Sequence, residues 1–318
     1  MEGTHELKLF YGTSNPLLGE KITQELGIQK GLMTIKKFSN GETYVQYLEN
    51  VRAKDVFLLQ TGANPINDNL VELLIMIDAA KRSSAGRITA VIPNYFYARQ
   101  DRKAASREPI TAKLVADLLT AAGAQRVLAI DLHSEQIQGF FNIPLDNLPA
   151  RTMMIRKAKE LSNNFVIVSP DAGAAKESTK IASKMCCGLA IINKVRSYAS
   201  CEHNKCTALN IIGDEIKGKD CLMFDDMVDT GGSICNAAEL LKKEGANKVY
   251  AFVTHGVLSN NAVEKINSSQ IDKLFITNSL PLKEKSEKIE VISIAKYLAD
   301  AIKCINEDRS VSTLFENP

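Results

Sequence analysis

The sequence lacks the strong charge excess of a nucleic-acid-binding protein. Its 39 Lys and Arg residues nearly balance 37 Asp and Glu residues, which leaves a formal net charge of +2. Nucleic-acid binders usually carry a clear basic excess or a basic stripe, and neither is present. Any anionic partner must therefore be held by a local site, and we expect no nucleic-acid partner.

The features of membrane and secreted proteins are missing as well. No apolar run approaches the ~18 residues that a membrane-spanning helix needs. The first residues, through Glu6, are polar and contain no apolar signal core. The 7 cysteines are odd in number and scattered, which argues against a disulfide framework and favours a reducing compartment. We therefore expect a cytoplasmic protein with no membrane partner.

What is present is an ordinary globular composition with a regular pattern of short apolar runs. The 318 residues are 45% hydrophobic and 24% charged, which suits two domains of common size. A helix is predicted over Asn67–Ser83, where the apolar residues fall on one stripe. The predicted strands are Leu7–Tyr11, Val56–Gln60, Arg87–Ile92, Val127–Ile130, Val166–Ser169, Leu189–Ile192, Asp220–Phe224, Val249–Val253 and Leu274–Thr277. Short apolar strands separated by helices indicate an α/β fold with parallel sheets covered on both faces.

An internal repeat supports two domains of the same kind. Residues Ala116–His133 and Ala238–His255 align without gaps, and each copy reads as a helix, a Gly-Ala turn, a strand and a histidine. Gly123 and Gly245 stand where the C-caps of the two helices are expected. We infer a duplication, with the two halves meeting near Pro144–Arg151.

One loop of the second half carries the chemistry of a phosphate site. The segment Asp225–Ser233 reads DDMVDTGGS, follows an apolar strand and precedes a helix. Ligands of parallel sheets bind beyond the carboxyl ends of the strands. Gly231 and Gly232 permit a close approach of the backbone, and Thr230 with the amides of the helix start can bind a phosphate. The alternative is an N-capped turn with solvated acids.

Two acids of this loop indicate a sugar and a metal. Asp225 and Asp226 are adjacent and suit the vicinal hydroxyls of a ribose. Carboxylates beside a phosphate also suit Mg²⁺, which prefers oxygen ligands. The corresponding loop of the first half, Tyr95–Lys103, is cationic and aromatic instead, which suits the phosphates and the base of ATP.

These motifs resemble a known family. The Asp225–Ser233 segment resembles the phosphoribosyl-binding loop of type I phosphoribosyltransferase folds. The run Asp131–Asp146 resembles the signature of ribose-phosphate diphosphokinases of class I, which make phosphoribosyl diphosphate. The resemblance extends from Lys8 to Phe315. It implies two duplicated phosphoribosyltransferase-like domains, each with a central, mostly parallel sheet flanked by helices.

The resemblance also implies a division of labour along the chain. Residues 1–148 would supply ATP and metal contacts, residues 149–300 would bind ribose 5-phosphate, and residues 301–318 would form a tail that packs back on the N-terminal domain. The implied reaction transfers the β,γ-diphosphoryl group of Mg-ATP to the anomeric hydroxyl of ribose 5-phosphate. The products are AMP and phosphoribosyl diphosphate, which feeds nucleotide biosynthesis. The alternatives are a non-catalytic regulatory homologue of the synthetase and a phosphoribosyltransferase.

Site residues follow from the resemblance position by position. The catalytic pair is Lys194 and Arg196, and the metal ligands are His133 and Asp171, with Mg²⁺ as the cofactor. The residues matched to the ATP site are Phe38, Asn40, Gly41, Glu42, Arg99, Gln100 and Asp101. The residues matched to the ribose 5-phosphate site are Arg196, Asp225, Asp226, Asp229, Thr230, Gly231, Gly232 and Ser233. Taken alone, the segment 38–42 predicts only a β-turn, because Asn-Gly is a strong turn signal.

A regulatory anion site is implied too, with inorganic phosphate as activator and ADP as inhibitor, in a homohexamer built from dimers. Its matched residues are Arg52, Arg107, Gln138, Asp146, Asn147, Ser310, Ser312 and Phe315. Taken alone, the C-terminal run also fits a frayed tail.

Two places depart from the family pattern. The loop Ser197–Cys206 carries Cys201, His203 and Cys206 in place of the usual basic residues and prolines, without the spacing of a zinc site. Glu177 stands near a position that is usually basic, which predicts weaker local phosphate affinity.

Overall fold

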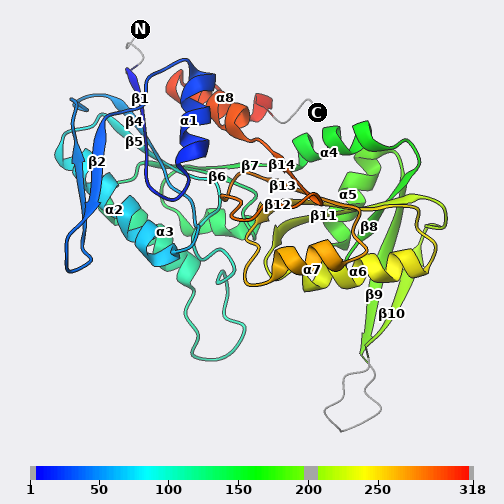
Figure 1. Ribbon diagram of the computed structural model, residues 1–318. Helices are drawn as coiled ribbons and strands as arrows, with labels where there is room; N and C mark the ends of the chain where they lie inside the picture. Colours follow the sequence, from blue (N-terminus) through cyan, green and yellow to red (C-terminus); the bar gives the residue numbers. More distant parts are fainter. Residues whose placement is uncertain (1–4, 197–206, 315–318) are drawn as a thin grey trace. The chain divides into compact units, whose positions relative to one another are not determined.

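The computed structural model describes residues 5–196 and 207–314, and the chain forms two compact units (Figure 1). Unit 1 comprises Met1–Ala150, Asn278–Pro281 and Ser293–Pro318, and unit 2 comprises Arg151–Thr277 and Leu282–Ile292. The chain therefore passes from unit 2 into unit 1 at residues 278–281, returns to unit 2, and ends in unit 1. The sequence analysis divided the chain at 148/149 and 300/301, whereas the units divide at 150/151 and the last segment already joins unit 1 at residue 293.

Unit 1 contains a five-stranded sheet in which every strand is parallel to its neighbours. The strand order is β1 (Leu7–Tyr11), β4 (Asp55–Leu59), β5 (Arg87–Ile92), β6 (Arg126–Ile130) and β7 (Leu145–Leu148). All residues of β4 are buried, as expected for a parallel strand covered on both faces. Alternate residues such as Val56 and Leu58 pack with α2 (Ile66–Arg82) and α3 (Thr111–Ala122) on one face.

Other elements of unit 1 surround this sheet. Helices α1 (Pro16–Leu26) and α8 (Ala295–Asn306) pack against each other although they lie at opposite ends of the sequence (Figure 1). A hairpin of β2 (Met33–Lys37) and β3 (Thr43–Tyr47) packs on α2. Short 3-10 helices follow β6 at Glu135–Phe140 (η1) and follow α8 at Ser312–Leu314 (η2).

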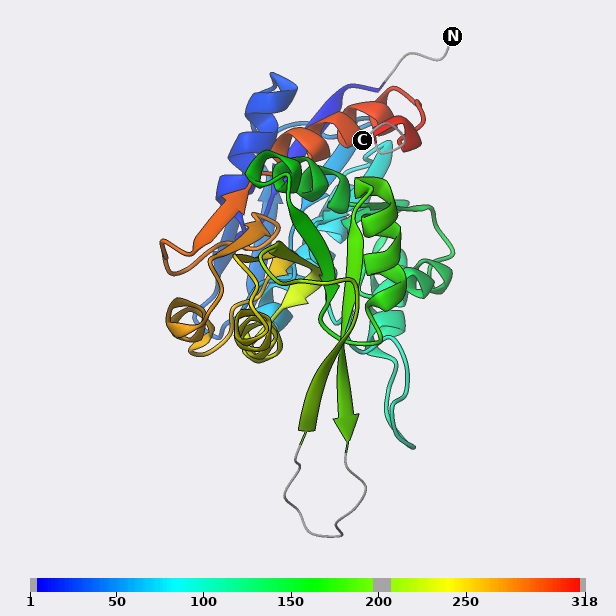
Figure 2. The same cartoon turned by 90° about the vertical axis from the view of Figure 1, so that its right-hand side faces the viewer.

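Unit 2 contains a seven-stranded sheet that is parallel except at one edge. Its strand order is β10 (Thr207–Gly213), β9 (Gly188–Arg196), β8 (Phe165–Ser169), β11 (Asp220–Val228), β12 (Val249–Gly256), β13 (Lys273–Thr277) and β14 (Ile289–Ile292). Only β10 is antiparallel to its neighbour, and Figure 2 shows β9 and β10 running side by side.

Alternating side chains of this sheet build two separate cores. Val168 and Met223 point to the face covered by α6 (Gly232–Lys243) and α7 (Ala262–Ser268). Ile167 and Leu222, one residue away, point to the face covered by α4 (Arg151–Leu161) and α5 (Ala175–Met185). Successive side chains of a strand point to opposite faces, so the apolar runs of the sequence supply both cores at once. Figure 1 shows α4 and α5 on one face of this sheet and α6 and α7 on the other.

The predicted repeat is confirmed as a repeated strand–helix–strand unit. The first copy is β5–α3–β6 and the second is β11–α6–β12, and in each copy the two strands are parallel neighbours. Gly123 and Gly245 both have a positive φ, 125° and 89°, at the ends of the two helices. The prediction of an α/β fold with mostly parallel sheets is confirmed.

Some strands differ from the predicted ones. The strands β2, β3, β7, β10 and β14 were not predicted, and β9 and β11 extend past their apolar cores to Arg196 and Val228. The residues of β2 and β3 are half-buried or exposed, so they present no continuous apolar run. Among the described residues, no helix is long and apolar enough to cross a membrane.

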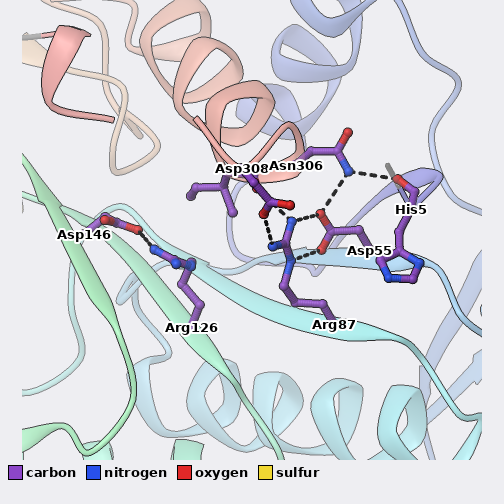
Figure 3. Close-up of polar contacts among 8 residues, drawn as sticks. His5, Asp55, Arg87, Arg126, Asp146, Asn306 and Asp308 are labelled. Carbon is purple, nitrogen blue, oxygen red and sulfur yellow. Dashed lines mark hydrogen bonds and ion pairs between the residues drawn. The ribbon is translucent and has the colours of Figure 1, made fainter. Parts of the chain in front are cut away.

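A partly buried ion pair joins the end of α8 to the five-stranded sheet of unit 1 (Figure 3). Asp55, which is fully buried, accepts two bonds from Arg87, at 2.9 Å and 2.5 Å, and one from Asn306 at 2.9 Å. Arg87 also donates to the carbonyl of Ile305 at 2.7 Å and to Asp308 at 2.9 Å. The start of β4, the start of β5 and the end of α8 therefore share one hydrogen-bonded cluster.

This cluster makes a stability prediction. The substitution Asp55→Asn removes the charge opposite Arg87 while keeping the shape, and we expect a loss of about 3 kcal/mol in the free energy of unfolding, the scale for breaking a buried ion pair. Urea unfolding measures the change. The control Asp78→Asn removes the partner of Arg82 on the exposed surface of α2 and should leave the midpoint unchanged. Equal effects of the two substitutions would contradict the role of the Asp55–Arg87 pair.

Candidate active site

Acidic residues gather where two neighbouring strands of unit 2 end. β8 and β11 are parallel and paired up to Val168 and Met223, so their carboxyl ends open at the same edge of the sheet. After β8, the exposed residue Asp171 accepts a hydrogen bond from the amide of Ala174 at 3.0 Å, just before α5 begins. Ser169 donates to the carbonyl of Asp171 at 2.7 Å. The Asp171 carboxylate is thus fixed in a short turn at this edge.

Asp225 and Asp226 lie on β11 and not in a loop, which corrects the sequence analysis. The strand continues to Val228 because it keeps its pairing with β12 after the pairing with β8 has ended. The apolar run stops at Phe224, where the burial of the strand is interrupted at residues 225–227 before Val228 is buried again. The amide of Asp226 donates to Asp225 Oδ1 at 2.9 Å, which orients the Asp225 carboxylate.

Desolvation and the neighbouring acids together raise the pKa of Asp225 to about 7. Desolvation by neighbouring protein groups is the largest cause, followed by the hydrogen bond and the like charge of Asp226, with a smaller contribution from Asp171. Asp225 is exposed at the sheet edge, and there the adjacent carboxylate of Asp226 disfavours its charged form and keeps its pKa raised. A site with this much negative charge favours a cation or a donor-rich ligand such as a diol.

The segment after β11 presents an uncapped helix start. Gly231, with a φ of 75°, is the N-cap of α6, and no side chain caps this helix. The alternative prediction of a turn capped by a side chain is therefore wrong. Thr230 and Ser233 are both exposed beside the first amides of α6, and unsatisfied amides at a helix start favour an anion. The carbonyl of Asp229 accepts from the amide of Ser259 at 3.0 Å, which ties this loop to the loop after β12.

The predicted catalytic pair lies on β9. Lys194 and Arg196 were expected to follow this strand, but the strand includes both, and their backbones pair with Leu209 and Thr207 of β10. β9 also neighbours β8, so these residues stand beyond the same edge as Asp171. The predicted loop 197–206, with its cysteines and histidine, lies outside the described residues.

In unit 1, the loop after β5 differs from the prediction in its aromatic residues. Tyr95 is 3% exposed and Phe96 is fully buried, so both belong to the core and cannot offer a face to a base. Tyr95 donates to the carbonyl of Ala112 at 3.1 Å. The apolar character of these side chains drives them inward, which the sequence pattern of an aromatic loop did not reveal.

The polar residues of this loop remain at the surface. Arg99 and Gln100 are exposed, and Asp101 is half-exposed. The carbonyl of Gln100 accepts from the amide of Ala112 at 3.2 Å, and its side chain accepts from Thr111 at 2.5 Å, so α3 holds this end of the loop. His133 follows the neighbouring strand β6 and is exposed, whereas its counterpart in the repeat, His255, is buried in β12.

The predicted turn at residues 38–42 is confirmed as the tip of the β2–β3 hairpin. Gly41 has a φ of 91°, and the amide of Phe38 donates to the carbonyl of Glu42 at 2.8 Å. A hollow of about 400 Å³ lies between this tip and α2. Its lining residues are Lys37, Phe38, Gly41, Glu42, Thr43, Asn67, Asp68, Val71 and Ile75. Three residues of the predicted ATP set line this hollow, and Asn40, Arg99, Gln100 and Asp101 do not.

A second hollow brings together most of the predicted regulatory residues. It has a volume of about 440 Å³, and its lining includes Gln138, Asp146, Asn147, Ser310 and Ser312. Arg52 and Arg107 are exposed and do not line it, and Phe315 lies outside the described residues.

Two cations that the sequence analysis missed line the same hollow. Arg126 donates to Asp146 at 2.5 Å (Figure 3). Arg309 pairs with Glu307 at 2.6 Å. Neither arginine belongs to a motif, so only the fold could bring them to this place.

The departure at Glu177 is explained locally. Glu177 forms ion pairs with Arg151 and with Lys180, the latter at 3.2 Å. Its charge is thus balanced within α4 and α5, and the predicted weakening of phosphate binding stays a prediction.

The fold and the site define a class. This is a two-unit α/β protein of the phosphoribosyltransferase-like type, with an uncapped helix start and paired carboxylates at the carboxyl edge of a parallel sheet. Residues 7–123 match the family model described as the N-terminal domain of ribose phosphate pyrophosphokinase. Residues 193–316 match the model described as the phosphoribosyl synthetase-associated domain.

Full-length relatives give the family. The chain is 49% identical over 315 residues to a ribose-phosphate pyrophosphokinase of Clostridium acetobutylicum, covering 98% of this chain and 97% of the relative. It is 49% identical to one of Rhizobium meliloti, covering 98% and 100%. The crystal structure of phosphoribosylpyrophosphate synthetase from Mycobacterium smegmatis matches with a TM-score of 0.89 at 41% identity, covering 95% of this chain and 99% of that chain. The chain belongs to the ribose-phosphate pyrophosphokinase family.

The raised pKa of Asp225 makes a prediction about stability and pH. In the unfolded chain this carboxyl group titrates near its ordinary value of 3.8, and in the folded chain near 7. The folded chain thus binds the proton more tightly, so the contribution of Asp225 to stability falls as the pH rises through this window. We expect Asp225→Asn, without Mg²⁺ or substrates, to raise the melting temperature at pH 8, and the gain to shrink toward pH 5.

Thermal unfolding followed by circular dichroism at the two pH values measures this difference. Asp300→Asn, which removes one charge from the surface of α8, is the control and should show no such gain. A gain for Asp225→Asn that is the same at both pH values would contradict the raised pKa.

Proposed function

We propose that this chain is a ribose-phosphate diphosphokinase. It transfers the β,γ-diphosphoryl group of ATP to the anomeric hydroxyl of ribose 5-phosphate and supplies phosphoribosyl diphosphate for nucleotide biosynthesis. The observation that carries the proposal is the edge of unit 2, where Asp225 and Asp226 lie near the end of β11 and the chain then leads into the uncapped start of α6. Relatives at 49% identity over 98% of the chain bear the name of this activity.

Ribose 5-phosphate fits this edge by charge and by spacing along the chain. The amides at the start of α6 with Thr230 and Ser233 would hold the 5-phosphate, since a helix start favours an anion. Asp225 and Asp226 would accept hydrogen bonds from the two ribose hydroxyls. Asp229 and the backbone of Gly231 and Gly232 complete the ribose 5-phosphate set.

ATP is assigned to residues of unit 1. Arg99 and Gln100, with Asp101 beside them, are exposed on the loop after β5, where a guanidinium can bind phosphate oxygens in two places. Phe38 is 49% exposed at the hairpin tip, which suits an adenine face. Phe38 and Asn40 protrude with the hairpin, so we assign them, with Gly41 and Glu42, to the adenine end of an ATP site. We propose that this ATP site belongs to a second copy of the chain.

Mg²⁺ fits the oxygen donors of unit 2. Asp171, Asp225 and Asp226 crowd one edge, and the raised pKa of Asp225 reflects negative charge that a divalent cation would relieve. The described residues contain no group of three or more acidic, histidine or cysteine side chains that could hold a metal by themselves. In proteins, Mg²⁺ is commonly held by one or two carboxylates together with substrate phosphates. Asp171 would be the protein ligand, with His133 acting through water or the ATP phosphates, and the ion would neutralise phosphate charge.

For the transfer itself, the chain must orient the two substrates and supply positive charge. The anomeric oxygen forms a bond to the β-phosphorus, and the bond from that phosphorus to the α,β-bridging oxygen breaks, so the oxygen leaves with AMP. The hydroxyl proton passes to solvent, since no side chain is assigned as a base. Lys194 and Arg196 would stabilise the charge that develops on the β-phosphate and on the leaving oxygen.

Regulation and assembly complete the proposal. The hollow lined by Gln138, Asp146, Asn147, Ser310 and Ser312 is assigned to a regulatory anion, with inorganic phosphate as activator. A homohexamer built from dimers and a cytoplasmic location are proposed on the same family grounds. The non-catalytic homologue requires damage to the site, yet Lys194, Arg196, His133 and the 229–233 loop are all present.

A direct assay tests the activity. Purified chain with Mg-ATP and ribose 5-phosphate should form AMP and phosphoribosyl diphosphate in equal amounts, and inorganic phosphate should increase the rate. Chromatographic separation measures both products. If neither product forms with or without phosphate, the chain is not this enzyme, and an unchanged rate with phosphate removes the regulatory assignment alone.

The catalytic assignment predicts the effect of one substitution. Lys194→Ala should lower turnover at least ~10²-fold, because it removes one preorganised positive donor. Lys194→Arg keeps the charge and should lose less. The control Lys243→Ala, at the far end of α6, should leave turnover unchanged. Near-normal turnover of folded Lys194→Ala would sink the assignment.

A further inference from the structure

The loops that follow β4 and β5 are tied together at the carboxyl edge of unit 1. The amide of Asn94 donates to Thr61 Oγ1 at 3.0 Å, and the Asn94 side chain donates to the carbonyl of Gly62 at 3.0 Å. The amide of Gly62 donates in turn to the carbonyl of Asn94 at 2.8 Å. A Cβ atom at Gly62 would lie 2.9 Å from that carbonyl oxygen, so this close approach requires glycine.

The Thr61 hydroxyl has a second bond in a different direction. It donates to the carbonyl of Ser279 at 2.9 Å, and both residues are fully buried. Ser279 belongs to residues 278–281, the segment of unit 1 through which the chain passes between β13 and β14 of unit 2. Asn15 holds the same segment through a bond to the carbonyl of Asn278 at 2.9 Å.

The backbone of Thr61 is fixed as well. Its amide donates to Ser14 Oγ at 2.9 Å, and Ser14 Oγ donates to Gln60 Oε1 at 2.5 Å. Gln60 also donates to the buried carboxylate of Glu72 at 2.7 Å. Thr61 therefore sits in a polar network with little freedom to move, and its hydroxyl is the part of that network that reaches Asn94.

Asn94 begins the loop that carries the proposed ATP contacts. Tyr95 and Phe96 follow it into the core, and Arg99 and Gln100 come next at the surface. The far end of this loop is held by the bond from the amide of Ala112 to the carbonyl of Gln100. The near end is held by Thr61 and Gly62, because the backbone and the side chain of Asn94 form hydrogen bonds with these two residues.

We propose that Thr61 is a positioning residue for ATP: its buried hydroxyl fixes the near end of the 94–101 loop against the 278–281 segment and so sets the place of Arg99 and Gln100. This inference rests on the proposed assignment of ATP to that loop. Thr61 would touch no substrate and would act through Asn94. Its loss should therefore weaken ATP binding and leave ribose 5-phosphate binding in unit 2 nearly unchanged.

The same sheet supplies a matched control. Thr89 of β5 is fully buried like Thr61, but its hydroxyl has no hydrogen-bond partner among the described residues. Thr61→Val and Thr89→Val are the same chemical change at two buried positions. The first removes an acceptor from the Asn94 amide and a donor from the Ser279 carbonyl, and the second removes no hydrogen bond.

The experiment measures the KM for ATP and the KM for ribose 5-phosphate in Thr61→Val, Thr61→Ser, Thr89→Val and Arg99→Ala. Thr61→Val should raise the KM for ATP about tenfold, the scale of one buried amide that has lost its acceptor. Its KM for ribose 5-phosphate should change less than about twofold. A general loss of stability would not produce a change in the KM for ATP alone. Thr61→Ser, which keeps the hydroxyl, should restore the KM for ATP, and Thr89→Val should match the unsubstituted chain.

The other outcomes decide against the inference. The inference is overturned if Thr61→Val leaves the KM for ATP unchanged, if it changes both KM values equally, or if Thr61→Ser does not restore the KM for ATP. In each of these cases, a raised KM for ATP in Arg99→Ala still supports the assignment of ATP to the loop. An unchanged KM for ATP in Arg99→Ala removes the ATP assignment itself, and the role of Thr61 falls with it. If Thr61→Val does not fold, Asn94→Ala replaces it, because it removes only the side-chain bond to Gly62 and should raise the KM for ATP several-fold.

Discussion

Parallel pairing of the strands is the constraint on which the whole site depends. A parallel strand must be followed by a crossover, so successive strands return in the same direction and their carboxyl ends open at one edge. In unit 2 this brings Asp171, after β8, next to Asp225 on β11, although 53 residues separate the two acids in the sequence. In unit 1 the same rule brings the loop after β5 beside His133, which follows β6. The chemistry of each unit is therefore set by which side chains stand at a few strand ends.

The two copies of the repeat show how this constraint permits divergence. Their helices and strands correspond, yet β11 carries two carboxylates near its end and leads into a glycine N-cap, whereas β5 leads into buried aromatic residues and then an exposed arginine. Residues within the sheets must fill two cores, because alternate side chains face opposite layers of helices. Residues past the strand ends do not have to fill either core. Charge can consequently change sign between the two copies without disturbing the packing that holds either sheet together.

Sequence patterns predict the buried parts of this fold and fail where burial ends. The strand β5 was predicted residue for residue, because its apolar run coincides with the covered part of the sheet. β11 was predicted to end at Phe224, yet it continues through Asp225 and Asp226, because hydrogen bonding to β12 persists after the apolar cover stops. Tyr95 and Phe96 were placed with the ligand, but their hydrophobic area is better satisfied in the core. Arg126 and Arg309 were missed beside the second hollow, since residues brought together only by tertiary structure leave no local signal.

The buried polar residues near β4 and β5 cannot be explained by the stability of the core alone. Gln60, Thr61 and Glu72 are nearly or fully buried, and a buried polar group costs free energy unless it is hydrogen-bonded. Apolar residues would fill the same space without that demand, and Thr89 shows that the sheet tolerates even an unsatisfied hydroxyl. Apolar contacts, however, are non-directional and do not fix how one chain segment is oriented against another. The Thr61 hydroxyl accepts a hydrogen bond from the Asn94 amide and donates one to the Ser279 carbonyl, and these two bonds specify one arrangement of three chain segments, where packing alone would permit several. The polar network is thus placed where the geometry of a loop matters more than the depth of its burial.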